Sequence, residues 1–152
     1  MISPLLDGLL DPRHVLLDLS GKTSGEAVWE IVELLRESGE LSKPNEFFDA
    51  VMEREEKAST VANGGVAFPH ARTELVEEIV LGIGRSGKGI PFGPDKTPVH
   101  LIFLIAVPQQ MVNDYLICVG GLARRLNKEA TRQALLAAST PAEFLERLRA
   151  DE

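Results

Sequence analysis

The residues best suited to chemistry lie in one run, Arg-Glu-Glu-Lys-Ala-Ser-Thr-Val-Ala-Asn-Gly-Gly-Val-Ala-Phe-Pro-His-Ala-Arg, at positions 54–72. The run offers two arginines, two hydroxyls, an adjacent glycine pair and an imidazole: Arg54, Arg72, Ser59, Thr60, Gly64, Gly65 and His70. Arginines bind oxyanions with planar guanidinium groups, and a glycine turn leaves backbone N–H groups free to donate. An imidazole is a nucleophile that forms covalent intermediates. The run therefore suits a phosphoryl group bonded to nitrogen.

The backbone around His70 is expected to be stiff. Pro69 holds its own φ near −65° and pushes Phe68 into an extended conformation. The apolar run 66–68 is predicted as a strand, so we expect His70 at the end of that strand, where a loop begins. Sites in α/β sheets are usually built at strand ends. A lone histidine is more often structural than functional, but these neighbours favour a functional role.

Other chemistries lack the motifs that they need. A hydrolase elbow requires Gly-x-Ser-x-Gly, and none is present. Three histidines without ligand spacing and a single cysteine, Cys118, do not predict a metal site. No phosphate-binding or dinucleotide-binding glycine motif opens a helix. We therefore expect neither a metal nor a cofactor, and we interpret Cys118 as a helix core residue.

Length and composition predict one soluble domain covering residues 1–152, with 44% apolar and 26% charged residues. The net charge of −7 argues against nucleic acid or an anionic membrane as the main partner. One cysteine rules out an intrachain disulfide framework and suits a reducing compartment. No apolar run approaches about 18 residues, and no signal peptide opens the chain. A cytoplasmic location is expected.

The first half of the chain predicts one strand followed by two helices. The apolar run 14–19 predicts the strand, with His14 at its start as an exposed structural histidine. The capping-box pattern Thr23-Ser24-Gly25-Glu26 predicts the start of the first helix. A second helix is expected over about 44–57, with Ser42 as its N-cap.

The second half predicts strands and then helices. Further strands are expected over 66–68, 78–85 and 99–107, a glycine- and proline-rich loop over 86–98, and helices from 113 to a break near Asn127, from 129 to 138, and after Thr140. Gly82 and Gly84 indicate a close backbone approach or a bulge. This order predicts an α/β fold with a single mixed β-sheet flanked by helices on both sides, an α/β/α sandwich.

Three pieces of the 54–72 run resemble a known active-site signature: Arg54-Glu55, Ser59-Thr60 and the stretch from Asn63 to Arg72. The signature is that of the fructose/mannitol-class (type 2) enzyme IIA domain of the bacterial sugar phosphotransferase system, which includes the nitrogen-regulatory IIA branch. The similarity extends nearly end to end, through the strand ending at Pro108 and the helix after it.

The resemblance implies that His70 accepts a phosphoryl group from the phosphohistidine of the carrier protein HPr, or of its nitrogen-branch counterpart. His70 would then pass the group to a IIB domain or keep it as a regulatory mark. Arg54 would face the transferred group, while Ser59 and Thr60 would support the loop or donate to phosphate. The phosphoryl group arrives already activated, so this chemistry needs no metal or cofactor.

One position departs from the family pattern. The family usually carries a second histidine at the start of the helix after Pro108, and Tyr115 stands there in this chain. A phenol donates one hydrogen bond but carries no positive charge near neutral pH. The alternative reading is therefore a regulatory protein-binding module with a IIA fold and weakened or lost phosphoryl transfer. A small hydrolase that uses His70 as a base is a third reading, and His100 is expected to be structural.

Overall fold

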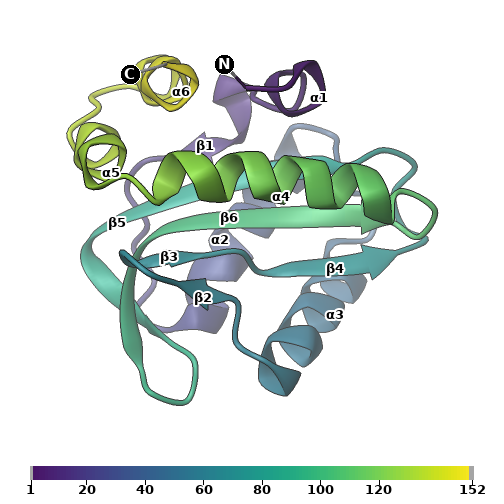
Figure 1. Cartoon of the computed structure of the whole chain (residues 1–152). Helices are drawn as coiled ribbons and strands as arrows, with labels where there is room; N and C mark the ends of the chain where they lie inside the picture. Colours follow the sequence, from purple (N-terminus) through teal and green to yellow (C-terminus); the bar gives the residue numbers. More distant parts are fainter. Residues whose placement is uncertain (1, 151–152) are drawn as a thin grey trace.

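A six-stranded mixed sheet crosses the middle of the molecule in the computed structural model, which describes residues 2–150 (Figure 1). The helical segments are α1 (Pro4–Asp7), η1 (Pro12–His14, a 3-10 turn), α2 (Ser24–Glu37), α3 (Pro44–Lys57), α4 (Val112–Leu126), α5 (Glu129–Leu136) and α6 (Pro141–Arg149). The strands are β1 (Val15–Leu16), β2 (Val61–Ala62), β3 (Val66–Ala67), β4 (His70–Thr73), β5 (Val80–Phe92) and β6 (Thr97–Pro108).

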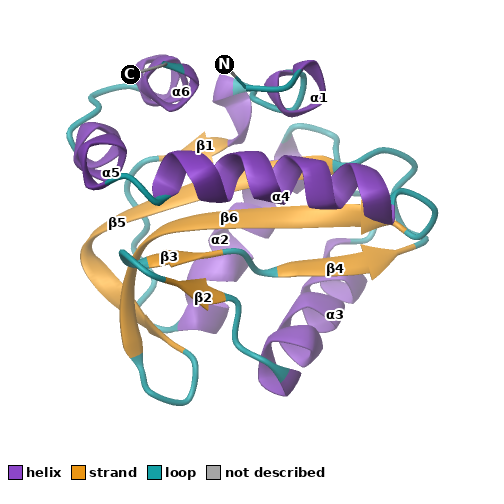
Figure 2. Cartoon of the chain, in the orientation of Figure 1, coloured by secondary structure: helices purple, strands orange, loops and turns teal. Residues whose placement is uncertain are grey.

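The sheet is mixed because it combines parallel and antiparallel pairs. Its order is β1-β5-β6-β3-β2, with β4 also paired to β6. Strands β5 and β6 are antiparallel, whereas β3 and β4 both run parallel to β6. Helix α4 lies in front of the sheet in Figure 2, and α2 and α3 lie behind it. The predicted mixed sheet with helices on both sides is confirmed.

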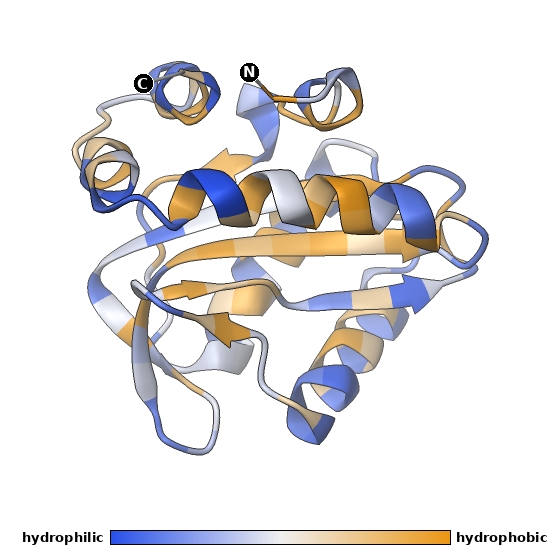
Figure 3. Cartoon of the chain, in the orientation of Figure 1, coloured by the Kyte–Doolittle hydropathy of each residue, from blue (hydrophilic) through white to orange (hydrophobic). Residues whose placement is uncertain are grey.

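Strand β6 supplies the core of both layers. Its side chains point alternately to the two faces of the sheet. Leu101, Phe103 and Ile105 join the core beneath α4, while Ile102 and Leu104 join the core with α2 and α3. All five side chains are at most 1% exposed. Figure 3 shows β6 as an almost unbroken hydrophobic strand, the pattern of a strand covered on both faces.

Helix α2 lies unusually close to β5 at two glycines. A Cβ built on Gly82 would lie 2.6 Å from Cγ2 of Ile31, and one on Gly84 would lie 2.7 Å from Cδ1 of the same residue. Real Cβ atoms do not approach other atoms so closely, so the helix can pack here only against glycine. The predicted close approach at Gly82 and Gly84 is confirmed.

We expect Gly82→Ala to lower the free energy of unfolding by about 1–3 kcal/mol, because the added methyl overpacks the α2–β5 contact. The measurement is urea unfolding followed by circular dichroism. Gly87→Ala is the matched control, since a Cβ on Gly87 meets nothing within 4 Å. Equal midpoints for the two variants would contradict the close packing.

The expectation of a loop over residues 86–98 is wrong. Strand β5 continues to Phe92 and β6 begins at Thr97, so the two strands form a long β-hairpin with a short turn. The outer part of this hairpin, residues 86–98, is called the β5–β6 arm. The pairing register shifts between Arg85 and Ile90, and the arm resumes with Ile90 opposite Val99. Glycines in this segment adopt turn and bulge conformations instead of ending the strand.

The N-terminal elements also differ from the prediction. The strand expected over 14–19 shrinks to β1, and His14 closes η1 with only 7% of its surface exposed. His14 is therefore a buried residue, not an exposed one. Ser42 does not cap α3, whose N-cap is Lys43 without a side-chain bond. The hydroxyl of Thr23 accepts from the Glu26 N–H at 3.1 Å, so the predicted cap of α2 is confirmed.

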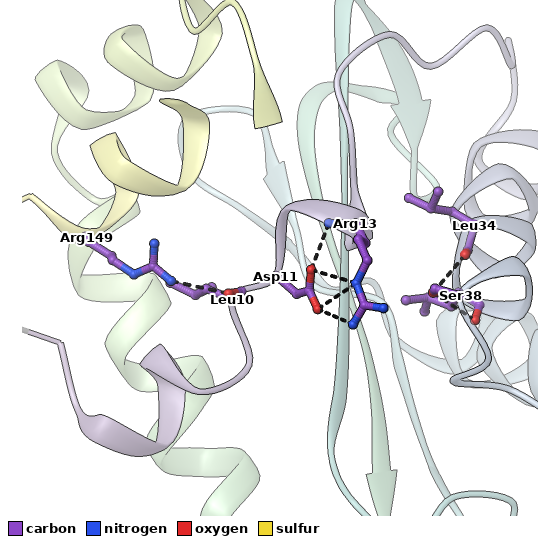
Figure 4. A network of polar contacts seen from close by, with 7 residues as sticks. Leu10, Asp11, Arg13, Leu34, Ser38 and Arg149 are labelled. Atoms are coloured by element: carbon purple, nitrogen blue, oxygen red, sulfur yellow. Dashed lines mark hydrogen bonds and ion pairs between the residues drawn. The ribbon is translucent and has the colours of Figure 1, made fainter. Parts of the chain in front are cut away.

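Polar contacts join the two ends of the described chain (Figure 4). The Arg149 guanidinium of α6 donates to the carbonyl of Leu10 at 3.2 Å and to the carboxylate of Asp7 at 2.6 Å. The Asp11 carboxylate accepts hydrogen bonds from the backbone N–H and from the guanidinium of Arg13. The hydrogen bond from the guanidinium lowers the pKa of Asp11 to about 2. The Arg149 contacts join α6 to the N-terminal segment, and the Asp11–Arg13 contacts stabilise the turn within that segment.

Candidate functional site

His70 is the first residue of β4, paired with Ile105 of β6. The expectation that it ends a strand is wrong, because β3 and β4 follow the same edge of β6 and are separated only at Phe68 and Pro69. Pro69 has no N–H and interrupts the ladder. Its carbonyl still accepts from the Ile105 N–H at 3.0 Å, so pairing resumes at once. His70 therefore sits on backbone held by the central strand.

The two ring nitrogens of His70 have different surroundings. Nδ1 lies 3.0 Å from the carbonyl oxygen of Phe68. A carbonyl can only accept, so Nδ1 carries the proton and donates it. In the neutral ring Nε2 therefore keeps its lone pair. The tautomer leaves Nε2 as the nucleophilic nitrogen.

Burial lowers the pKa of His70 from its ordinary value. The Phe68 carbonyl opposes this shift by accepting from the ring, the positive charge of Arg54 adds to it, and Glu55 opposes it. A lowered pKa keeps the imidazole neutral near pH 7, the form that can attack phosphorus.

Arg54 lies in the last turn of α3, beside the edge of β4. A hollow of about 390 Å³ is lined by Ala50, Arg54, His70, Ala71 and Arg72. The guanidinium Nη1 donates to the carbonyl of Ala58 at 2.9 Å, which orients the side chain across the end of its own helix. The structure thus brings His70 and both arginines of the 54–72 run to one hollow.

Tyr115 packs against the imidazole of His70. Its ring centroid is 5.0 Å from that of His70, with 32° between the ring planes. It comes from the first turns of α4, 45 residues along the chain (115 − 70). Burial raises the pKa of Tyr115 although the charge of Arg54 opposes this, so the phenol stays protonated and can donate.

Ser59 and Thr60 shape the loop after α3. The Thr60 hydroxyl donates to Glu55 at 2.7 Å, and the Thr60 N–H donates to the same carboxylate at 2.9 Å. Ser59 Oγ accepts from the N–H of Val61 at 3.2 Å. The sequence analysis gave Glu55 no structural role of its own and so missed this anchoring contact. The available signal was a carboxylate in the last turn of α3 followed closely by the hydroxyl of Thr60, just beyond the end of the helix.

Gly64 and Gly65 do not reach His70, contrary to the expectation that they form one site with it. Both have positive φ, 89° and 77°, and form the turn between β2 and β3. His70 is five residues beyond Gly65 along an extended edge, a distance of roughly 16 Å at about 3.3 Å per residue. The glycine turn instead contacts His100, whose N–H donates to the Gly65 carbonyl at 2.8 Å.

His100 has its own structural partner. Its Nδ1 lies 2.9 Å from the carbonyl oxygen of Ser86, and its ring packs against the backbone of Gly65 and Gly89. These contacts hold the base of the β5–β6 arm. They agree with the structural role expected for His100.

Residues 8–150 match the family described as "Phosphoenolpyruvate-dependent sugar phosphotransferase system, EIIA 2". The chain belongs to this EIIA type 2 family.

Similar proteins carry both sugar-transport and regulatory names. The chain is 33% identical over 119 residues to a "PTS system fructose-specific EIIA component" of Haloferax volcanii, with 78% of this chain and 77% of that protein covered. It is 31% identical over 133 residues to a "PTS system fructose-specific EIIABC component" of Bacillus subtilis, with 87% of this chain covered. The chain spans only 21% of that second protein's length.

A solved EIIA structure has the same fold. The nitrogen regulatory protein IIA-Ntr from Neisseria meningitidis superposes with a TM-score of 0.85 at 28% identity, covering 95% of this chain and 99% of that one. Within residues 2–150, no helix of this EIIA chain is both long and apolar enough to span a bilayer.

We expect the His70 imidazole to titrate below the ordinary histidine value of about 6.5, and Arg54→Gln to raise its midpoint because a neighbouring cation is removed. The measurement is a pH series of long-range ¹H–¹⁵N NMR spectra. Since the unfolded chain binds this proton more tightly than the EIIA fold does, the free energy of unfolding should fall as the pH drops through the ordinary histidine value.

Arg36→Gln is the control for this titration, because Arg36 occupies the last turn of α2 as Arg54 does that of α3. It should leave the His70 midpoint unchanged. A midpoint above the ordinary value in the unaltered chain would show that burial does not govern this ring.

Proposed function

We propose that this chain is a histidine phosphocarrier, a phosphotransferase component that accepts a phosphoryl group on His70 from phospho-HPr or its nitrogen-branch counterpart. It then passes the group to a IIB domain or keeps it as a regulatory signal. The observation that carries the proposal is the Nδ1 contact of His70 with the Phe68 carbonyl, which leaves Nε2 as the nucleophile of a residue that shares one hollow with Arg54.

The proposed step exchanges one P–N bond for another. The Nε2 lone pair of His70 attacks phosphorus while the bond between phosphorus and the donor imidazole breaks, and that electron pair returns to the donor ring. The His70 ring gains positive charge, and its Nδ1–H continues to donate to the Phe68 carbonyl. Positioning and charge stabilisation dominate such transfers, because the phosphoryl group needs little covalent help.

Arg54 and Arg72 supply the positive charge for the three phosphoryl oxygens. Both line the hollow that contains His70, and guanidinium groups match phosphate oxygens with paired N–H donors. Arg72 follows His70 by two positions on β4, so the two side chains share one face of the strand. Tyr115 adds one O–H donor at the imidazole.

The partners follow from the chemistry. An acceptor histidine needs a donor that carries an activated phosphoryl group, and HPr-like carriers and IIB domains exchange such groups in the cytoplasm. We therefore place this EIIA chain in that compartment. No metal or cofactor enters the step.

The test is incubation with phosphoenolpyruvate, enzyme I and HPr, followed by intact-mass measurement under non-acidic conditions. The expected result is a gain of one phosphoryl group that is lost in mild acid and retained in base, as a P–N bond requires. If no mass gain occurs with either HPr or its nitrogen-branch counterpart, the carrier function is excluded.

A second function, docking of a partner protein with slow or lost transfer, is favoured by Tyr115. The phenol fills the space against His70 but adds no positive charge where negative charge accumulates. In that case the protein would act by binding its partner through the IIA surface, and not by transferring a phosphoryl group.

Tyr115→His distinguishes these two functions. We expect it to raise the rate of phosphoryl gain about tenfold, the effect of roughly 1.4 kcal/mol of added charge stabilisation. The gain should be larger at pH 6 than at pH 8, because the new imidazole must be protonated. Rates come from a quenched mass time course.

Tyr115→Phe is the control, since it keeps the ring against His70 and removes only the hydroxyl. It should lower the rate by no more than the value of one hydrogen bond, about fivefold at roughly 1 kcal/mol. An unchanged rate in Tyr115→His would mean that the missing charge is supplied elsewhere in the site.

A further inference from the structure

A second hollow of about 340 Å³ lies between the β2–β3 hairpin and the C-terminal half of α4. Its lining combines a floor of buried apolar side chains with a rim of exposed residues: Val66, Phe68 and Leu126 form the floor, and Ala62, Asn63, Ala123, Arg124 and Asn127 form the rim. None of these residues lines the hollow at His70. Along α4, Ala123 is eight positions beyond Tyr115, or about 12 Å at 1.5 Å per residue. The hollow is therefore separate from the phosphoryl site.

The floor offers an apolar surface that is already formed. Val66, Phe68 and Leu126 are at most 8% exposed and are packed into the core beneath α4. Phe68 also stacks on Phe103, with 5.8 Å between ring centroids. A floor held by core packing does not have to be ordered when a ligand binds, which favours binding.

The rim offers polar side chains that are available to form hydrogen bonds with a ligand. Among the described residues, the side chains of Asn63, Arg124 and Asn127 have no hydrogen-bond or ion-pair partner. Arg124 provides a cationic fork that matches a carboxylate, and each amide provides both donors and an acceptor. A few polar groups around an apolar concave surface are typical of small-molecule sites.

We propose that this hollow binds a small monocarboxylate with an aromatic or branched apolar body. The apolar body would lie on Phe68 and Leu126, and the carboxylate would accept from Arg124. The volume equals that of about eleven liquid water molecules at roughly 30 Å³ each, enough room for a small arylalkanoate.

The site is coupled to His70 through one residue. The ring of Phe68 forms part of the floor, while its carbonyl accepts from Nδ1 of His70. A ligand on this floor contacts the residue whose carbonyl orients the imidazole, so we expect its binding to change the environment of His70. Coupling between two sites is reciprocal, so the state of His70 also changes the affinity for the carboxylate.

The test is a titration of ¹⁵N-labelled chain with hydrocinnamate, which has an aryl body, a short chain and one carboxylate. We expect saturable shifts, with a Kd on the order of a few millimolar, in the amides of residues 62–68 and 123–127, including the side-chain amides of the two asparagines. Hydrocinnamyl alcohol, which lacks the charge, should bind at least about fivefold more weakly. Equal binding of acid and alcohol, or shifts centred on the His70 hollow, would overturn the assignment.

Two variants test the site itself. Arg124→Gln should weaken hydrocinnamate at least about fivefold, and Ala123→Leu should abolish binding by filling the hollow without disturbing the helix. Lys128→Gln removes a nearby charge that does not line the hollow and should leave the Kd unchanged. Loss of affinity in Lys128→Gln equal to that in Arg124→Gln would mean that the effect is only long-range charge.

The coupling has its own readout in the same titration. Saturation should move the imidazole resonances of His70 in the unaltered chain and leave them in place in Ala123→Leu. A bound probe that does not move these resonances overturns the coupling through Phe68. Neither measurement involves a phosphoryl donor, so this inference stands or fails independently of the proposed carrier function.

Discussion

The His70→Gln variant is expected to gain no phosphoryl group from phosphoenolpyruvate, enzyme I and HPr, a loss of at least about 10⁴-fold in rate. Glutamine can still donate an amide N–H to the Phe68 carbonyl, so the local backbone keeps its partner. The amide nitrogen has no available lone pair, however, and cannot attack phosphorus. The change therefore removes the nucleophile with little effect on the hydrogen-bonding pattern. Intact-mass measurement reads the result directly.

His100→Gln is the matched control for this result. His100 is the other half-buried histidine, and its Nδ1 also meets a backbone carbonyl, that of Ser86. If His70 is the acceptor, His100→Gln should gain one phosphoryl group as the unaltered chain does. Urea midpoints of both variants show whether the fold survives. A phosphoryl gain in His70→Gln together with none in His100→Gln would identify His100, and not His70, as the nucleophile.

The layers of the fold could be predicted because local signals and packing agree there. The Thr23 capping box begins α2 where expected, and the hydroxyl of Thr140 caps α6. The apolar run at 99–107 becomes the central strand because both its faces are covered by helices. In each case the residues nearby in sequence carry the information, so periodicity and capping are sufficient.

The β5–β6 arm could not be predicted from glycine and proline content. These residues usually end strands, but Ile90 and Phe92 still alternate toward the core and pull the backbone into the sheet. Pairing with β6 outweighs the local preference for a turn. The alternation of Ile90 and Phe92 was the signal, and it was hidden by the surrounding breakers.

The candidate site, too, could be predicted only in part, because local sequence patterns do not give contacts between distant segments. The distance of Gly65 from His70 follows from their register on β6, which no local pattern gives. The contact of Tyr115 with His70 joins two elements far apart in sequence, and only the family resemblance drew attention to it. By contrast, the grouping of His70 with Arg54 and Arg72 followed from one continuous run of sequence.

The Arg54→Gln variant is expected to be folded but to accept the phosphoryl group about 10²–10³-fold more slowly, the usual cost of removing one preorganised charge-stabilising group. Arg54 shares the hollow with His70, and its charge influences the pKa of both His70 and Tyr115. Of the residues whose charge or contacts shift these two pKa values, only Arg54 affects both rings. The measurement is the initial rate of phosphoryl gain at a fixed concentration of phospho-HPr.

Two further variants separate charge from structure. Arg54 also donates to the Ala58 carbonyl at the end of α3, so a slow rate could come from fraying of that helix. Arg54→Lys keeps the positive charge but loses the planar fork, and we expect a rate between those of the unaltered chain and Arg54→Gln. Arg36→Gln, at the end of α2, should retain the full rate.

Raising the pH cannot restore Arg54→Gln if the arginine acts on the phosphoryl oxygens. Without the cation the His70 pKa rises, so alkaline solution returns the imidazole to its neutral, nucleophilic form. Any loss that comes only from protonation of His70 should therefore disappear above pH 8. A rate that stays low there shows that Arg54 stabilises the transferred group itself, whereas full recovery would limit its role to keeping the imidazole neutral.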